Sequence, residues 1–262
     1  MKGVTNKQLK RIKDLFKEKK SRYAESAFIL EGYKVIMDAL NKGYVFDVIL
    51  VSDKFLSEEE QRLYIEGLEK KGILVLQTVS DKLKGVSPLK NPEGILGVVQ
   101  MKKEKTIDKF LLRNKSSLMV LCDNIQDPGN LGTIVRTSLA FSVNSIFLYG
   151  DNVDVYNPKV IRATSGAILD MNFYMGGIDG VNKIRRKGFC VVSSIIDKEK
   201  SKNIDKLKLP KNRVIVFGNE GKGISKSILS VTDFFYYIPI NRKIESLNVS
   251  VAAGISLYEF SK

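Results

Sequence analysis

Residues 117–150 read SLMVLCDNIQDPGNLGTIVRTSLAFSVNSIFLYG, and they decide the fold. The stretch opens on one continuous apolar run, SLMVLCD (117–123), and closes on another, SIFLYG (145–150). Between them, Asp127 to Gly129 predict a tight turn, and Asn130 is a candidate cap for the helix that follows. Continuous apolar strands joined through a helix are typical of a parallel sheet that is covered on both faces. The stretch therefore predicts an α/β domain.

The same alternation of strand and helix extends in both directions from this stretch. Downstream, apolar strands are predicted at FCVVSSI (189–195), RVIVFG (213–218) and YYIPI (236–240), with a closing helix over 247–260. Upstream, strands are predicted at 27–32, 45–52, 73–77 and 95–101, and helices at 1–20, 33–43 and 57–72. A charged stretch at 102–116 separates the two series. We predict a small N-terminal α/β domain (1–101), a linker (102–116) and a C-terminal α/β domain with a parallel sheet (117–262).

The charge of the chain favours a polyanionic partner. The net charge is +14, and the first 22 residues alone carry nine basic and two acidic side chains. Lys and Arg that neutralise phosphates release counterions, so such an excess is typical of nucleic-acid binding. Many basic proteins bind no nucleic acid, however, and charge alone leaves the question open.

Missing residue types exclude several classes of chemistry. The chain has no histidine, which excludes imidazole-based catalytic triads and most catalytic zinc sites, and we expect no metal. Its two cysteines, Cys122 and Cys190, lie in apolar runs and are predicted to be buried thiols in a reducing compartment. No apolar run approaches the roughly 20 residues that span a bilayer, and the N-terminus does not resemble a signal peptide. We therefore expect a cytoplasmic protein that contacts no membrane.

The loop after residue 123 places an arginine among apolar neighbours. Arg136 lies about one and a half turns into the predicted helix, close to Leu131 and Leu139. An unpaired buried guanidinium is unfavourable, so the side chain either has a partner or extends to the surface.

A glycine-rich turn follows the strand predicted at 213–218. The sequence GNEGKG (218–223) combines three glycines, which allow close backbone approach, with Glu220 at its centre. Taken alone, the pattern fits a phosphate, an adenosine or only a sharp turn, and Glu220 either pairs with Arg136 or is solvated. A Walker loop is absent, so nucleotide hydrolysis is not expected.

A third polar loop precedes the closing helix. Ser246 is a candidate N-cap for that helix, and the small residues Ala252, Ala253 and Gly254 allow close packing against another backbone. Taken alone, this pattern fits a capped helix in a tight interface.

Together, the three loops resemble the SpoU/TrmH family of RNA ribose 2′-O-methyltransferases, which belong to the knotted SPOUT superfamily. The resemblance rests on N-x-x-D-P-G-N-x-G-x-x-x-R (124–136), F-G-N-E-G-x-G (217–223) and I-P-I-x-x-x-x-x-S-L-N-V-S-V-A (238–252). In the first half, FILEGYKVIMDAL (28–40) and NPEGILGVV (91–99) resemble the ribosomal-protein-like (L30e-like) RNA-binding domain of that family.

The resemblance implies a fold, a cofactor and an assembly. It implies that the C-terminal segment threads a trefoil knot, and that the protein is a homodimer with the closing helix in the interface. S-adenosylmethionine would bind in the knot against backbone groups near five residues, namely Gly218, Asn219, Ile238, Ile240 and Leu247.

The resemblance also assigns catalytic positions, namely Asn130, Arg136, Glu220, Ser246 and Asn248. The ribose 2′-oxygen attacks the sulfonium methyl group in line, so positioning contributes much of the rate. A guanidinium is a poor base. We therefore favour Arg136 as the group that holds the adjacent RNA phosphate and polarises the hydroxyl. Glu220 and Asn130 would orient Arg136, and Ser246 and Asn248 would shape the third loop.

The substrate that we favour is 23S ribosomal RNA, because shorter members of the family, which lack a separate N-terminal domain, commonly act on transfer RNA. A transfer-RNA 2′-O-methyltransferase and a non-catalytic RNA-binding protein are the alternatives. The sequence does not identify the methylated nucleotide, nor whether free RNA or a ribosomal particle is the substrate.

Overall fold

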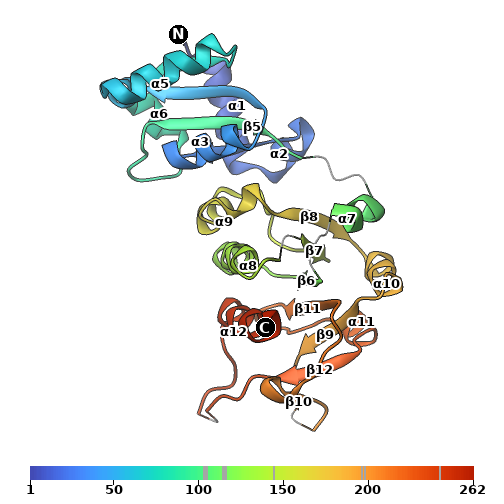
Figure 1. Ribbon diagram of the computed structural model, residues 1–262. Coiled ribbons are helices and arrows are strands. Elements are labelled where there is room, and N and C mark those ends of the chain that lie inside the picture. Colours follow the sequence, from blue (N-terminus) through green and yellow to red (C-terminus); the bar gives the residue numbers. More distant parts are fainter. Residues whose placement is uncertain (103–105, 114–116, 144, 196, 198, 242) are drawn as a thin grey trace. The chain divides into compact units, whose positions relative to one another are not determined.

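The computed structural model describes residues 1–102, 106–113, 117–143, 145–195, 197, 199–241 and 243–262. These residues form two compact units, and Figure 1 labels many of their helices and strands. The first unit holds residues 1–102 and 156–161, and the second holds the remaining described residues from 106 onward. Of the predicted linker, residues 103–105 and 114–116 lie outside the described residues. Within the described ranges, no helix is both long and apolar enough to cross a membrane.

The first unit is built on a five-stranded sheet in the order β1-β4-β3-β5-β2. Strand β4 pairs in parallel with β1 and β3, whereas β5 pairs antiparallel with β3 and β2. The strands are β1 (Lys2–Gly3), β2 (Ala27–Glu31), β3 (Phe46–Ser52), β4 (Val75–Thr78) and β5 (Ile95–Gln100). The helices are α1 (Asn6–Lys17), α2 (Lys19–Glu25), α3 (Tyr33–Asn41), α4 (Asp53–Leu56), α5 (Glu59–Lys70) and α6 (Ser80–Val86). The α/β class predicted for this part of the chain is confirmed.

Helix α1 carries the basic N-terminal segment. It begins after Thr5, whose side chain forms a reciprocal capping box with Gln8. Its apolar face, with Ile12 and Leu15, is buried in a core cluster that it shares with the sheet and α6. Each such buried side chain contributes about 1.5–3 kcal/mol to folding. The opposite face presents exposed lysines, namely Lys7, Lys10, Lys13 and Lys17, so the basic segment has both a structural face and a charged face.

The second unit is built on a seven-stranded sheet in which every pairing is parallel, in the order β10-β12-β9-β11-β6-β7-β8. The strands are β6 (Leu118–Asp123), β7 (Ser145–Tyr149), β8 (Asn172–Gly176), β9 (Cys190–Ser194), β10 (Lys202–Asn203), β11 (Arg213–Gly218) and β12 (Phe234–Tyr237). Strand β11 lies between β6 and β9, which both precede it in the chain. The predicted parallel sheet is confirmed.

Helices cover both faces of this sheet (Figure 1). On one face, α8 (Pro128–Ala140) packs against α12 (Val249–Ser261), which also contacts β11. The other face is covered by α7 (Ile107–Arg113), α10 (Ile178–Arg186) and α11 (Lys226–Leu229), whose buried side chains share one cluster with β6, β7, β9 and β11. The remaining elements are the short 3-10 helices at Ala167–Leu169 and Ile204–Lys206, and α9 (Pro158–Ala163), whose residues up to Ile161 belong to the first unit.

Helix α7 lies inside residues 102–116, the segment that the sequence presents as a linker. Ile107 and Phe110 are buried in the core of the second unit, where the Phe110 ring lies 5.6 Å from that of Tyr174 and 6.5 Å from that of Phe147. Residues 106–113 of this segment are therefore integral to the second unit. The signal was the helical spacing of Ile107, Phe110 and Leu111, which the surrounding charges obscured.

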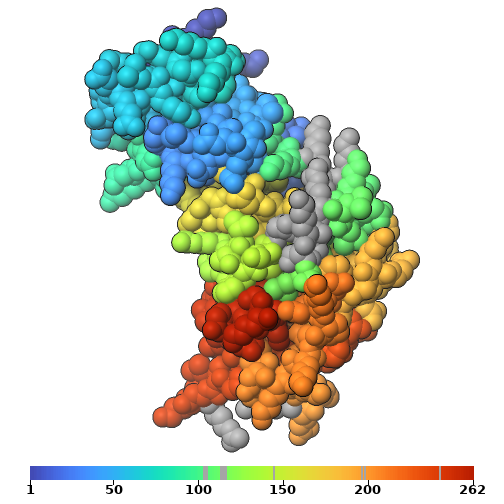
Figure 2. All heavy atoms as spheres, viewed as in Figure 1, coloured from blue at the N-terminus to red at the C-terminus, as the bar shows by residue number. Residues whose placement is uncertain are grey.

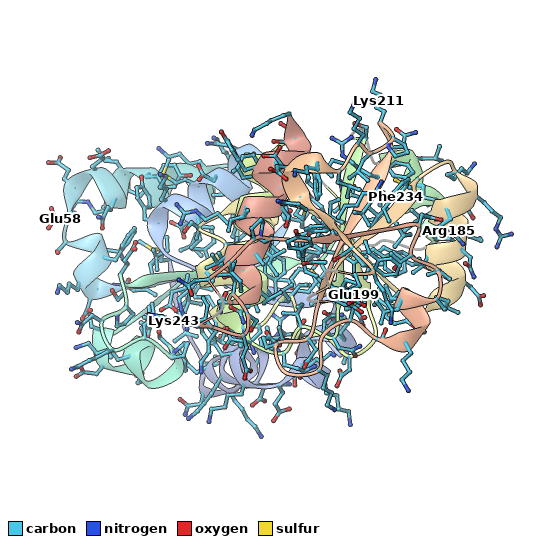
Figure 3. All side chains as sticks on the ribbon, turned by 90° about the horizontal axis from the view of Figure 1, so that it is seen from below. Glu58, Arg185, Glu199, Lys211, Phe234 and Lys243 are labelled. Atoms are coloured by element: carbon cyan, nitrogen blue, oxygen red, sulfur yellow. The ribbon has the colours of Figure 1, made fainter. Side chains whose placement is uncertain are left out.

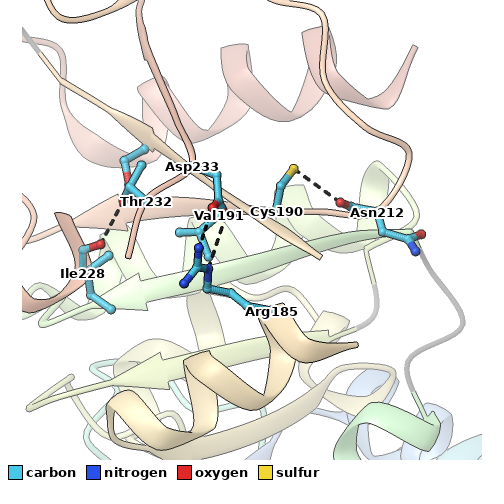
Figure 4. A network of polar contacts seen from close by, with 8 residues as sticks. Arg185, Cys190, Val191, Asn212, Ile228, Thr232 and Asp233 are labelled. Atoms are coloured by element: carbon cyan, nitrogen blue, oxygen red, sulfur yellow. Dashed lines mark hydrogen bonds and ion pairs between the residues drawn. The ribbon is translucent and has the colours of Figure 1, made fainter. Parts of the chain in front are cut away.

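At the amino-terminal edge of the sheet, Asp233 joins three elements (Figure 4). Its carboxylate accepts hydrogen bonds from Arg185 Nη2 at 2.6 Å and from the Val191 backbone N–H at 2.8 Å. This contact ties α10 to β9 and to the start of β12. Arg185 and Phe234, both labelled in Figure 3, line an open groove of about 790 Å³ beside it.

The two cysteines differ in environment. Cys122 is fully buried in β6, as predicted, and burial raises the pKa of its thiol above the ordinary range. Cys190 is only half-buried, contrary to the prediction, because it begins β9 at the edge of the sheet beside the groove. Neither cysteine forms a disulfide bond.

Candidate active site

The three polar loops identified in the sequence leave the same edge of the parallel sheet. They follow β6 at Asp123, β11 at Gly218 and β12 at Tyr237. Asp123 and Gly218 are partners in the sheet register, so the first two loops begin side by side. In open parallel sheets, ligands bind beyond the carboxyl ends of the strands. This edge is therefore the candidate active site.

The first loop ends in a cap that differs from the prediction. Asp127, and not Asn130, is the N-cap of α8, and its carboxylate accepts a hydrogen bond from the Asn130 backbone N–H at 2.8 Å. Pro128 occupies the first turn, where its missing N–H leaves no helical bond unmade. Because Asp127 does the capping, the side-chain amide of Asn130 is available for contacts with the other two loops.

Glu220 anchors the second loop to the first. Its carboxylate accepts hydrogen bonds from Asn130 Nδ2 at 3.0 Å and from the backbone N–H groups of Asp127 at 3.1 Å and Gln126 at 3.2 Å. Burial raises the pKa of Glu220, but the hydrogen bonds from Asn130 and the backbone outweigh burial, and the net pKa lies below its ordinary value. Glu220 is therefore ionised at neutral pH, where a carboxylate that accepts three hydrogen bonds serves as an anchor.

The side chain of Asn130 also contacts the third loop. Its Oδ1 accepts a hydrogen bond from Asn248 Nδ2 at 2.9 Å. Asn248 Oδ1 in turn accepts from Ser250 N at 2.9 Å and from Val251 N at 3.4 Å. Asn248, and not Ser246, is thus the N-cap of α12. A continuous chain of side chains, Glu220–Asn130–Asn248, joins all three loops.

Arg136 lies on the exposed side of α8, one and a half turns beyond Asn130. Its Nη1 donates a hydrogen bond to Ser165 Oγ at 2.9 Å. Across the described ranges, the contacts of Glu220 do not include Arg136. The pairing of Arg136 with Glu220 that the sequence left open is therefore not among these contacts, and Arg136 bonds to Ser165 instead. The connection between Asn130 and Arg136 is the rigid helix that they share.

The glycine-rich turn is shaped by its own backbone. A Cβ atom added to Gly218 would lie 2.5 Å from the Gly223 carbonyl carbon and 2.6 Å from the Ile224 nitrogen, so only glycine fits. Asn219 Oδ1 accepts hydrogen bonds from the backbone N–H groups of Gly221 at 3.0 Å and Lys222 at 2.9 Å. Gly218 is thus required by the fold of the turn, whatever ligand the turn contacts.

A pocket of about 560 Å³ opens where β9 and β12 end. Three of the five predicted cofactor positions line it, namely Ile238, Ile240 and Leu247, whereas Gly218 and Asn219 are not among its lining residues. Ser246, predicted as catalytic, is exposed and also lines this pocket. The other walls are formed by Ser194, Ile195, Tyr237, Asn241, Ile244, Glu245 and Ala252.

Two residues that contact predicted site residues were not themselves site candidates in the sequence. Asn124 adopts a left-handed conformation with φ of 57°, and its carbonyl accepts a hydrogen bond from Asn219 Nδ2 at 2.8 Å. Ser165, the partner of Arg136, is also left-handed, with φ of 48°. The dipeptide Ser165-Gly166 is a turn signal that could have drawn attention to it. Among the residues that the structure describes, no group of three or more His, Cys, Asp or Glu side chains is placed to hold a metal ion.

Solved structures of RNA methyltransferases match the fold of this chain. An S-adenosylmethionine-bound rRNA methyltransferase from Sinorhizobium meliloti aligns with a TM-score of 0.86 at 24% identity, covering 99% of this chain and 96% of that one. Residues 117–258 match the SpoU rRNA Methylase family, and residues 6–97 match the MRM3-like substrate binding domain. The chain belongs to the SpoU rRNA methylase family.

Curated relatives cover nearly the whole chain. The 23S rRNA (guanosine(2553)-2′-O)-methyltransferase RlmP of Bacillus subtilis is 28% identical over 98% of this chain and 98% of its own length. An uncharacterised tRNA/rRNA methyltransferase of Mycoplasma pneumoniae is 30% identical over 90% of this chain and 98% of its own length. The similarity thus extends over both units.

Proposed function

We propose that this protein transfers the methyl group of S-adenosylmethionine to the 2′-hydroxyl of a ribose in ribosomal RNA, with 23S RNA as the substrate. The observation that carries the proposal is the set of hydrogen-bonded side chains Glu220–Asn130–Asn248, which joins the three motifs and includes a residue of α8, the helix that bears Arg136. The similarity to RlmP, whose name specifies 2′-O-methylation of 23S rRNA, supports the choice of reaction and substrate.

The pocket beside the third loop suits an adenosine-containing cofactor. Its volume of about 560 Å³ lies within the usual range of ligand sites, roughly 300–1,000 Å³. Isoleucine side chains supply apolar walls, and Ile238, Ile240 and Leu247 would hold the cofactor there. For Gly218 and Asn219, a role in cofactor binding rests on the family resemblance of the glycine-rich turn alone. When bound, S-adenosylmethionine supplies the activated methyl group. The residues of the chain orient the acceptor and assist the loss of its proton.

Arg136 is the residue that we assign to the acceptor. Its exposed guanidinium can bind a backbone phosphate through two N–H donors and polarise the adjacent 2′-hydroxyl through a third. Glu220 is an unsuitable general base, because its carboxylate already accepts three hydrogen bonds and its pKa is lowered. We propose that the proton leaves through the bound phosphate. Asn130 and Asn248 hold the loops, and Ser246 borders the cofactor pocket.

The N-terminal part, residues 1–101, is proposed to bind RNA through its L30e-like fold, and residues 117–262 to carry the methyltransferase site. The match of residues 6–97 to a substrate-binding domain supports this division. The exposed lysines of α1 give that part a surface that attracts phosphates. Because ribosomal RNA is the substrate, we propose that the protein acts in the cytoplasm.

We also propose a homodimer in which α12 lies in the interface, and a trefoil knot at the C-terminal segment. Helix α12 lies on the face of the molecule seen in Figure 2, and Val251, Ile255 and Tyr258 are 51%, 39% and 57% exposed at a spacing that places them on one side. The position of β11 between two earlier strands is compatible with the knot. Light scattering tests the dimer, with Tyr258→Glu expected to yield a monomer and an exposed lysine of α1 changed to Glu as the matched control.

The reaction is tested with purified protein, tritiated S-adenosylmethionine and ribosomal RNA from a strain that lacks the gene. A 2′-O-methyl group blocks alkaline cleavage, so the label is expected in alkali-resistant dinucleotides. Label in mononucleotides would indicate base methylation and contradict the proposed reaction. Label in transfer RNA alone would contradict the proposed substrate, and the absence of transfer would favour a non-catalytic RNA-binding protein.

A further inference from the structure

The side chain that contacts Arg136 comes from outside the three family motifs. Ser165 follows Arg136 by 29 residues and lies in the turn between α9 and the 3-10 helix at Ala167–Leu169. Its Oγ accepts the 2.9 Å hydrogen bond from Arg136 Nη1, and this 3-10 helix packs against α8. The turn is thus held next to the helix that carries the arginine.

The backbone of this turn is strained where the contact is made. Ser165 has φ of 48°, a left-handed conformation that side chains with a Cβ adopt rarely, and Gly166 follows with φ of 89°. Such conformations are unfavourable by about 1–3 kcal/mol and gather at functional sites. The turn does not need the hydroxyl to hold its shape, because Ala167 N bonds to Thr164 O at 3.0 Å and Thr164 and Ala167 are buried.

We infer that Ser165 is a positioning residue for methyl transfer. Its hydroxyl fixes one end of the Arg136 guanidinium, so that the other N–H donors meet the RNA phosphate and the 2′-hydroxyl in one orientation. The inference rests on the proposed function. A guanidinium has five N–H donors in a rigid plane, so holding one nitrogen sets the direction of the others. Without the hydroxyl, the long side chain samples several rotamers, and productive encounters become a smaller fraction.

The variant Ser165→Gly distinguishes a role of the hydroxyl in orienting Arg136 from a role of Ser165 in the stability of the turn. Glycine adopts a positive φ readily, so this variant removes the hydrogen bond and relieves the strain at once. Ser142→Gly is the matched control, because Ser142 is likewise a left-handed serine, with φ of 61°, at the end of α8. Ser165→Asn tests rescue, since asparagine tolerates a left-handed backbone and offers an amide oxygen as acceptor.

We expect kcat to fall about tenfold in Ser165→Gly, with an unchanged KM for S-adenosylmethionine. The melting temperature should be unchanged or raised. Ser142→Gly should keep full activity, and Ser165→Asn should recover part of the loss. In an Arg136→Lys background, Ser165→Gly should add little further loss, because residues that act as a unit are not additive. A kcat equal to that of the wild type, or two losses that multiply fully, would overturn the inference.

A second measurement does not depend on catalysis. The ¹⁵N relaxation of the Arg136 Nε–H, assigned by its loss in Arg136→Lys, reports the order of the guanidinium. Ser165→Gly should make this group more mobile, and Ser142→Gly should not; an unchanged mobility in Ser165→Gly would overturn the inference. If the wild type transferred no methyl group to RNA, the proposed function would fail while this measurement still decided whether Ser165 orders Arg136.

Discussion

Replacing the side-chain amide of Asn130 with a carboxyl group is the sharpest test of the hydrogen bonds that connect the three loops. In Asn130→Asp, the Nδ2 donor that lies 3.0 Å from Glu220 Oε1 becomes an oxygen, whereas the acceptor for Asn248 Nδ2 is kept. Size and shape hardly change, and the backbone bond to the Asp127 cap is unaffected. The exchange thus replaces one attractive contact with a repulsive one and alters little else.

The size of the effect follows from the contact that is lost. A hydrogen bond to a charged group contributes about 1.5–3 kcal/mol, and about 1.4 kcal/mol corresponds to a factor of ten. Glu220 is partly exposed to solvent, which screens the added repulsion, so we take the lower part of this range. We expect kcat near pH 7.5 to fall about 10- to 30-fold, with a smaller change in the melting temperature.

The pH dependence of kcat in Asn130→Asp gives a result that can refute this account. Glu220 raises the pKa of the introduced carboxyl, so one proton is shared between the two groups as the pH falls. The variant should therefore regain part of its relative activity below neutral pH, where the protonated carboxyl again donates to Glu220. Asn212→Asp, an exposed site away from Glu220, is the control for the same change in charge. Equal kcat values and parallel pH profiles for the two variants would refute the connected-loop account.

Three further predictions address separate parts of the molecule. Because the folded pKa of Glu220 is lowered, its contribution to stability is present above its ordinary pKa of 4.5 and is lost as the pH falls through the folded value. The melting temperature of Glu220→Gln should therefore lie closest to that of the wild type in acid, and a constant difference across pH would contradict this. Arg136→Lys should lower kcat at least tenfold without weakening cofactor binding by calorimetry, because a point charge does not reproduce the bidentate fork; full activity would refute the orienting role. Phe110→Ala should reduce the free energy of unfolding by about 3–5 kcal/mol in denaturant titrations, because the ring is fully buried in the core; a loss below about 1 kcal/mol would mean that α7 is a detachable linker.

The parts of the fold that the sequence predicted are those with strong local signals. Continuous apolar runs marked β6, β7, β9 and β11, because a strand covered on both faces carries apolar residues throughout. Strand β8, which is only partly buried at the sheet edge, has no such run and was missed. Strand β12 ends at Tyr237, before Pro239, which lacks the N–H that a continuing strand would need.

For the candidate site, residue types were easier to predict than partners. The motif residues Asn130, Glu220 and Asn248 do meet, but the sequence does not reveal that Asp127 caps α8 and leaves the Asn130 amide to join the other two loops. The partner of Arg136 was also hidden. Ser165 lies in a separate turn, and only its left-handed backbone and the packing of the chain bring it to the arginine. Which donors and acceptors pair depends on how the folded chain brings separate segments together, and the sequence motifs do not contain that information.

The central claim is tested most directly by mapping ribose methylation across ribosomal and transfer RNA, with the gene present, deleted, and restored either as wild type or as Asn130→Asp. The account predicts that one 2′-O-methyl mark in large-subunit RNA disappears on deletion, returns with the wild-type gene and returns only weakly with the variant. An unchanged set of ribosomal marks after deletion would contradict it.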